Sequence, residues 1–206
     1  MNSAASLAAG LPVGRLSVRC LVVAAYAVPA VLAWALAGGL LGLLPLAPVC
    51  LGLAILYGLY YGITEVRGMR GLPAPGRRWQ VPQTMMIDAS PSRRVVVWGS
   101  VLGPGFLTRN PYAGFGMLPL VVAITGLAGP WAAVALGACA GLAHGGARAV
   151  ALLGDLRVTA PAVAGVPSAP SAQLDLLLKA VYARRLDGAV LLVIAVTAAA
   201  LAVSYF

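Results

Sequence analysis

Apolar residues occur in long blocks along the chain, separated by short polar segments. Predominantly apolar blocks occupy residues 20–37, 40–63, 130–153 and 187–205. Each block is long enough to cross the hydrocarbon core of a bilayer as a helix, which takes about 20 residues. The second block ends with three tyrosines, Tyr57, Tyr60 and Tyr61, and aromatic residues there suit the membrane interface. The pattern therefore predicts transmembrane helices in all four blocks.

The segment from Val95 to Leu127 is also apolar and holds no acidic residue, but prolines and glycines interrupt it. At about 1.5 Å per residue it is too long for one straight span. We favour two spans here, 95–108 and 112–127, which gives six in all. If 95–127 is instead one broken or re-entrant segment, the count is five. Either way the sequence predicts an all-α polytopic transmembrane bundle, with residues 1–206 as a single membrane domain.

Composition supports a membrane environment. The chain is 61% hydrophobic and 9% charged, whereas soluble domains have roughly half apolar and a quarter charged residues. The net charge of +9 comes from arginines that flank the apolar blocks, which indicates topology-setting charge and not nucleic-acid binding. Segment 64–94 carries six arginines (Arg67, Arg70, Arg77, Arg78, Arg93 and Arg94). By the positive-inside rule this loop and the amino terminus are cytoplasmic, in a multi-pass protein of the cell inner membrane.

The sequence Gly103-Pro104-Gly105 predicts a helix break inside the membrane region. Irregular backbone at membrane depth is tolerated only where protein buries it or where it lines a wet cavity. Transporters build binding sites at broken helices. The alternative is close helix packing, which is open to Gly99, Gly103, Gly114 and Gly116 because glycines let helices approach one another.

Arg109 and Arg148 are the only cations between Val95 and Leu153, and no acid in that region can neutralise them. A charge in lipid costs about 2.5–3.5 kcal/mol on insertion scales, so each should face a cavity, the interface or backbone carbonyls. A helix restarting after Asn110 and Pro111 would add its positive amino-terminal end. These features predict a path for an anionic solute, lined by Gly103, Pro104, Gly105, Thr108, Arg109, Asn110, His144 and Arg148.

His144 and Arg148 are four residues apart and so share one helix face. Arg148 is the expected main contact of the anion, and His144 is a candidate protonation switch. The alternatives are a satisfied polar contact for His144 and a snorkelling side chain for Arg148. All five acids are expected in loops or at helix ends, which argues against a carboxylate relay; they are Glu65, Asp88, Asp155, Asp175 and Asp187.

Residues 77–115 contain a Val-Pro pair, Val81-Pro82, ahead of a glycine-rich segment with Gly99, Leu102, Gly103, Gly105, Phe106 and Thr108. This pattern resembles membrane proteins of the CcdA/DsbD-like and methylamine-utilisation (MauF-like) group. The resemblance implies a six-helix bundle built from two three-helix halves. For CcdA-like members it implies transfer of reducing equivalents through a pair of intramembrane cysteines. This sequence departs from that pattern, because its glycine-rich break holds Pro104 and no cysteine.

The three cysteines, Cys20, Cys50 and Cys139, form no C-x-x-C motif. Cys50 and Cys139 fall in equivalent helices if the chain is two halves of three helices, so they are a candidate redox pair. The alternative is that each is a small apolar side chain. No metal-ligand spacing and no nucleotide or hydrolase motif is present, so the sequence predicts no metal, cofactor or catalytic residue and favours a protein that is not an enzyme.

Three functions remain open from the sequence. We favour a transport-class protein that moves or binds a small anionic solute. The second is a transmembrane thiol–disulfide relay resembling the CcdA group, which would use a thioredoxin-like partner. The third is a non-catalytic membrane subunit that supports a partner enzyme. The lipid bilayer is a partner in all three, and nucleic acid is a partner in none.

Overall fold

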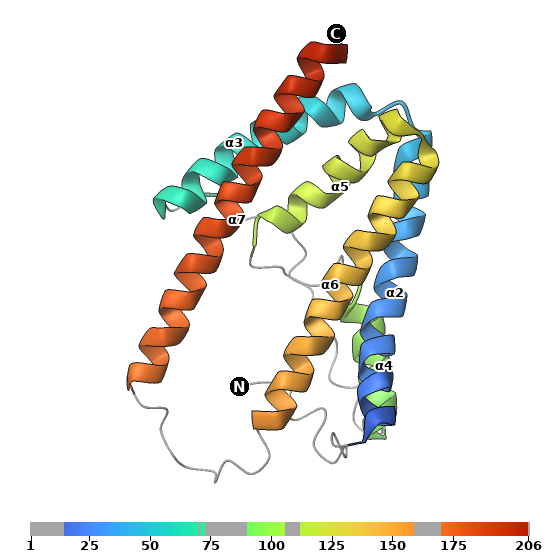
Figure 1. Ribbon diagram of the computed structural model, residues 1–206, viewed down its shortest axis with the longest axis vertical. Helices are drawn as coiled ribbons and strands as arrows, with labels where there is room; N and C mark the ends of the chain where they lie inside the picture. Colours follow the sequence, from blue (N-terminus) through green and yellow to red (C-terminus); the bar gives the residue numbers. More distant parts are fainter. Residues whose placement is uncertain (1–14, 70, 73–89, 106–111, 159–169, 206) are drawn as a thin grey trace. The chain divides into compact units, whose positions relative to one another are not determined.

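The computed structural model describes residues 15–69, 71–72, 90–105, 112–158 and 170–205. This part of the chain contains no strand (Figure 1). Its elements are α2 (Leu16–Leu43), α3 (Ala47–Arg67), α4 (Pro91–Leu102), α5 (Gly114–Thr125), the 3-10 turn η2 (Gly126–Ala128), α6 (Pro130–Val158) and α7 (Pro170–Tyr205). The predicted all-α class is confirmed for these residues.

Four helices in the described part are long and apolar enough to cross a membrane. The candidate spans are Leu16–Leu43, Ala47–Arg67, Pro130–Gly154 and Leu178–Tyr205. They overlap the four apolar blocks of the sequence, but α2 continues to Leu43 and the last candidate span begins at Leu178, before the predicted start at residue 187. Helices α4 and α5 have 12 residues each, and at about 1.5 Å per residue each is shorter than the hydrocarbon core of roughly 30 Å. A helical membrane bundle is therefore confirmed, while the count of six spans stays a prediction.

Many large apolar side chains point outward, while alanines and glycines make up much of the buried interior. Leu36, Trp131 and Val203 are 69%, 82% and 84% exposed, whereas Ala30 and Ala54 are fully buried. None of the buried residues in the described part is polar or charged. An apolar exterior around a core rich in alanine and glycine suits helices that pack on one another in lipid.

The chain forms two compact units, and the helices alternate between them. One unit contains α2 as far as Ala37, α4, and α6 from Val134 onward; the other contains α3, α5 and α7. Each unit thus has three helices, but these do not follow one another along the chain.

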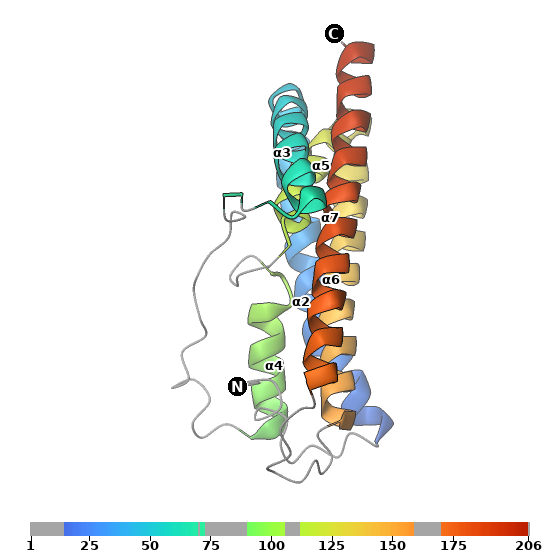
Figure 2. The same ribbon diagram turned by 90° about the vertical axis from the view of Figure 1, so that its left-hand side faces the viewer.

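In the first unit, glycines bring α2 and α6 together (Figures 1 and 2). A Cβ atom at any of three α6 glycines, one turn apart, would collide with a backbone carbonyl of α2. The pairs are Gly137 with Trp34, Gly141 with Ala30, and Gly145 with Tyr26. The residue numbers rise along α6 as they fall along α2, so the two helices are antiparallel. Because the glycines have no side chain, the two backbones lie at close range.

Helix α4 approaches α2 in the same way. A Cβ atom at Gly99 or Gly103 would collide with the carbonyl of Ala25 or Tyr26, respectively. The core of this unit is a cluster of buried side chains from α2, α4 and α6: Val22, Ala25, Tyr26, Val95, Ala149 and Leu152.

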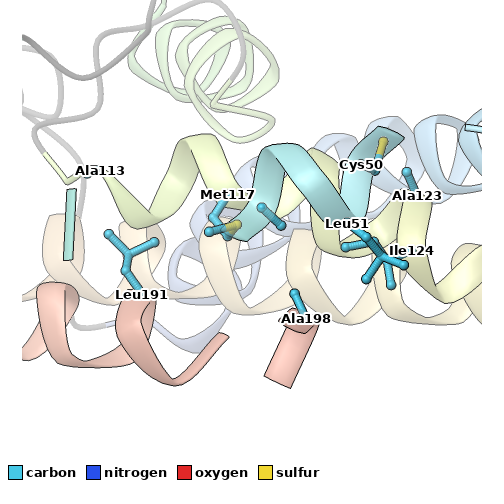
Figure 3. Close-up of a cluster of buried hydrophobic side chains, with 9 residues drawn as sticks. Cys50, Leu51, Ala113, Met117, Ala123, Ile124, Leu191 and Ala198 are labelled. Atoms are coloured by element: carbon cyan, nitrogen blue, oxygen red, sulfur yellow. The ribbon is translucent and has the colours of Figure 1, made fainter. Parts of the chain in front are cut away.

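The second unit has its own core, in which α3, α5 and α7 all contact one another (Figure 3). Met117 of α5 and Leu191 of α7 are almost fully buried there, beside Leu51 of α3. Gly58 of α3 leaves no room for a Cβ atom, which would lie 2.8 Å from Ala195 Cβ and 3.0 Å from Met117 Cε. Small residues therefore set the helix spacing in this unit as well.

Candidate functional site

The predicted helix break is present at Gly103-Pro104-Gly105. Helix α4 ends at Leu102, and Gly105 has φ +78°, in the left-handed region that favours glycine. The Gly105 N–H donates to the Leu102 carbonyl oxygen at 3.2 Å. Gly103 and Gly105 are buried. The chain thus turns out of its helix within the protein interior.

A tryptophan of α2 satisfies the backbone at this break. The indole Nε1 of Trp34 donates a hydrogen bond to the Pro104 carbonyl oxygen at 3.0 Å. Trp34 is fully buried. Since an unpaired carbonyl in an apolar interior is costly, this contact allows the break without a water-filled cavity. Gly99 and Gly103 have a packing role against α2, as the packing alternative requires.

His144 and Arg148 lie on α6 in the first unit, inside the candidate span Pro130–Gly154, and both are half-buried. Arg148 is close enough to act electrostatically on His144 and on Tyr26 of α2. Among the side chains that the structure describes, which do not include that of Asp155 on the same helix, these are the ionisable groups that interact with Arg148, and neither is a carboxylate. Arg148 is therefore a cation inside a candidate span, beside two side chains that can donate hydrogen bonds.

Tyr26 of α2 lies against both α4 and α6, the two described helices that carry residues of the predicted solute path. Its carbonyl lies against Gly103 of α4 and also against Gly145 of α6. Gly103 and Arg148 therefore both lie near one residue of α2. No sequence pattern marks Tyr26, because one tyrosine in an apolar helix has no distinctive spacing. Thr108, Arg109 and Asn110 lie outside the described residues, so their part of the path stays a prediction.

Two further side chains on α4 carry buried donors. Among the described residues, Arg94 Nε and Trp98 Nε1 are buried and have no hydrogen-bond partner. The predicted cytoplasmic loop 64–94 includes Arg94, but this residue lies in the first turns of α4, which begins at Pro91. Ser90 caps that helix, because its Oγ accepts from the Arg93 N–H at 3.4 Å. A serine followed by a proline was the available signal for this start.

The expectation that all acids lie in loops or at helix ends is wrong for Asp187. This residue lies inside α7, within the candidate span Leu178–Tyr205, and is half-buried. Its Oδ2 accepts a hydrogen bond from the Gly114 N–H at 2.9 Å. The amino-terminal end of α5, expected to help bind an anionic solute, is therefore occupied by the protein's own carboxylate. The last span was predicted to begin at residue 187, which put Asp187 at its end. In the structure α7 begins at Pro170, so Asp187 lies inside the helix.

The three cysteines are free thiols. Cys50 is buried on α3 in the second unit, while Cys139 is exposed on α6 in the first unit. Their pairing stays a prediction. Within the described residues no group of three or more histidine, cysteine or acidic side chains could hold a metal ion.

These observations define a multi-pass helical membrane protein with a cation, Arg148, inside one candidate span. Comparison with protein-family models, curated proteins and solved structures finds no match to this chain.

Proposed function

We propose that this is a transport-class membrane protein that binds a small anionic solute at Arg148. The observation that supports this most is the setting of the Arg148 side chain. It is half-buried within a candidate span, and the ionisable groups near it in the described part of the chain, His144 and Tyr26, carry no negative charge at neutral pH. An arginine in a membrane span requires a compensating partner, and an anionic solute would supply one.

The chemistry of the three side chains suits a carboxylate or phosphate. A guanidinium group offers paired N–H donors in a planar fork that matches two oxygens of such an anion. His144 lies one turn from Arg148 and can add a second positive charge when it is protonated. The Tyr26 hydroxyl can donate a further hydrogen bond. In this proposal Arg148 binds the anion, and His144 adjusts its affinity.

The proposed topology has six spans, with α4 and α5 as short or tilted crossings. It places the amino terminus, segment 64–94 and the carboxyl terminus in the cytoplasm. The arginines of segment 64–94 support this orientation through the positive-inside rule.

Anion binding can be tested by thermal unfolding of the purified protein in detergent micelles. Sodium phosphate, sodium acetate and sodium chloride are compared at equal ionic strength. An anion present at about a hundred times its dissociation constant should stabilise the folded protein by roughly 2.7 kcal/mol. We expect at least one anion to raise the melting temperature of the wild type but not that of Arg148→Gln. Arg185→Gln removes an exposed cation from α7 and is the matched control, with a wild-type response expected.

The anion proposal fails if Arg148→Gln inserts normally and retains every anion response of the wild type. Arg148 would then be a snorkelling residue. The glycine packing of α2 against α4 and α6 would in that case favour another of the candidate functions, a non-catalytic membrane subunit. That candidate predicts a partner enzyme that co-purifies with the tagged protein and with the Arg148→Gln variant in equal amounts.

A further inference from the structure

The start of α5 is held from two sides by side chains of other helices in the second unit. From α7, the Asp187 carboxylate accepts a hydrogen bond from the Gly114 N–H at 2.9 Å. From α3, the Tyr57 hydroxyl donates a hydrogen bond to the Ala113 carbonyl oxygen at 2.7 Å. The peptide group between Ala113 and Gly114 thus has a partner on its oxygen and another on its nitrogen.

This arrangement replaces a local helix cap. The first N–H groups of any helix lack partners within that helix, and the side chain of Ala113, at the N-cap position, cannot supply one. Asp187 does so from 73 residues away. A Cβ atom at position 114 would collide with the Asp187 carboxylate, so a larger residue there would displace this side chain from its present position. A negative charge also interacts favourably with the positive end of the helix dipole.

Neighbouring contacts fix Asp187 in place. Gly188, the next residue, packs against α3, where a Cβ atom at this position would lie 2.9 Å from the Gly62 carbonyl oxygen and from Glu65 Cβ. Leu191, one turn further along α7, is fully buried in the core of the unit. The backbone of α7 at Asp187 therefore cannot move away from α3 and α5 without a change in the packing of the unit.

A half-buried carboxylate inside a candidate span is a functional feature by default, since such residues are rare and often carry protons. Here the charge state of one side chain sets the strength of a hydrogen bond between two helices. Ionised, the carboxylate accepts a charge-assisted hydrogen bond from Gly114; with a proton added, it is neutral and this bond loses about half of its strength.

We propose that Asp187 is a proton-binding site and that its protonation releases the start of α5 from α7. One proton from water adds to the carboxylate to give the neutral acid, and no other bond forms or breaks. The proposal goes beyond anion binding at Arg148 and does not depend on it. It assigns a role to α5, the short helix that follows the chain break.

The other titratable groups near Asp187 come from two helices. From α3 these are Tyr57, which interacts electrostatically with Asp187, its ring neighbour Tyr61, and Glu65. Helix α5 contributes no titratable side chain between Gly114 and Thr125. Helix α7 itself carries the exposed cations Arg184 and Arg185 in the turn before Asp187.

The sign of the pH dependence follows from the charge. Tyrosine hydroxyls and arginines keep their protonation state in mildly acidic solution, and the Tyr57 bond to Ala113 therefore persists there. The Asp187 bond is present above the pKa of that carboxyl group and is lost as pH falls through it. The contact should therefore be strong at neutral pH and weak in acid.

Hydrogen–deuterium exchange of the full chain in detergent micelles tests the proposal, with rates corrected for the intrinsic effect of pH. We expect the backbone protection at the first turn of α5 to fall about threefold to tenfold on acidification, the factor that corresponds to half the strength of a charge-assisted hydrogen bond. Protection in α3 and in the rest of α7 should stay constant. Either of two results with the wild-type protein would by itself overturn the proposal. One is constant protection at the start of α5, and the other is a loss of protection shared by all helices.

Three variants sharpen this test. Asp187→Asn, which cannot ionise, should show low protection at the α5 start at every pH; wild-type pH dependence in this variant overturns the proposal. Glu65→Gln removes the neighbouring carboxylate of α3 and should retain the wild-type profile. Tyr57→Phe removes the bond to Ala113 and should lower protection at all pH values while leaving its pH dependence intact.

Discussion

Trp34 and Pro104 are joined by a hydrogen bond of 3.0 Å from the indole Nε1 to the carbonyl oxygen, across 70 residues of sequence. It links the middle of α2 to the point where the chain leaves α4. Lipid offers no donor for a carbonyl that its own helix no longer satisfies, so the donor must come from the protein. The buried indole of Trp34 is that donor, and the helix break is part of the packed interior of the first unit.

Replacing Trp34 should therefore destabilise the protein, because the hydrogen bond to the Pro104 carbonyl at the helix break is lost. Trp34→Phe keeps an aromatic ring but leaves the Pro104 carbonyl without its donor. We expect the free energy of unfolding to fall by about 1–3 kcal/mol, the cost of an unsatisfied buried polar group. Unfolding of the purified protein in mixed micelles of mild detergent and dodecyl sulfate measures this change.

Trp131→Phe is the matched control, because Trp131 is 82% exposed. Its free energy of unfolding should stay within about 0.5 kcal/mol of the wild-type value. Equal losses for the two variants would mean that aromatic volume, and not the hydrogen bond to Pro104, sets the effect.

The glycine row of α6 allows a second stability test. A Cβ atom at Gly141 would collide with the Ala30 carbonyl, so Gly141→Ala should force α2 and α6 apart. We expect a loss of about 1–3 kcal/mol, which is typical of overpacking a filled interface. The same unfolding assay in mixed micelles provides the measurement.

Gly146 is the control for this substitution. It lies in the same helix, and a Cβ atom there would meet nothing within 4 Å. Gly146→Ala should leave stability unchanged or raise it by up to about 1 kcal/mol, because alanine is the better helix former. A loss at position 146 as large as that at position 141 would contradict the packing argument.

Hydropathy predicted the four long helices because each contains a long apolar block, a property of local sequence. The row of Gly137, Gly141 and Gly145 is also visible in the sequence, since a spacing of four residues marks one helix face. The glycines predicted to allow close packing, Gly99 and Gly103, do pack against α2.

The tertiary contacts could not be read from the sequence. The partners in the bonds from Tyr57 to Ala113 and from Gly114 to Asp187 are 56 and 73 residues apart. No local pattern encodes such pairs. Tyr57 was expected in an interfacial aromatic belt, yet its hydroxyl binds backbone within the unit, because a polar atom on a packed helix face needs a partner there. Asp187 was expected at a helix end because the last predicted span begins at residue 187, whereas α7 already begins at Pro170.

The proposed topology predicts a cytoplasmic carboxyl terminus. Two spans lie between the amino terminus and segment 64–94, and four more between that segment and the end of the chain. Fusions of a reporter active only in the cytoplasm, and of one active only in the periplasm, to Phe206 measure the location directly. We expect activity of the cytoplasmic reporter alone. Activity of the periplasmic reporter would contradict the six-span count and favour a single re-entrant segment at 95–127.

Cys50 and Cys139 supply the test of a thiol–disulfide relay. A relay requires both thiols to cycle, so replacing either by serine should abolish the same activity, while Cys20→Ser has no effect. We expect no such cycle. The Cys50 side chain is packed in the core of the second unit beside Leu51 and Ala54, the setting of a small apolar residue, where thiolate formation is disfavoured.

Alkylation-shift assays on membranes, with and without reductant, measure the state of each thiol. Cys50 and Cys139 should be fully reduced under both conditions, and the double serine variant should fold as the wild type does. The assay compares the wild type with variants that lack one or two of the cysteines, which assigns each shift to a residue. Cys139, which is exposed on α6, should be alkylated faster than buried Cys50. A shift that depends on reductant and needs both residues would instead establish a disulfide between them. That result would require Cys50 to leave its buried position, and it would favour the relay over anion binding.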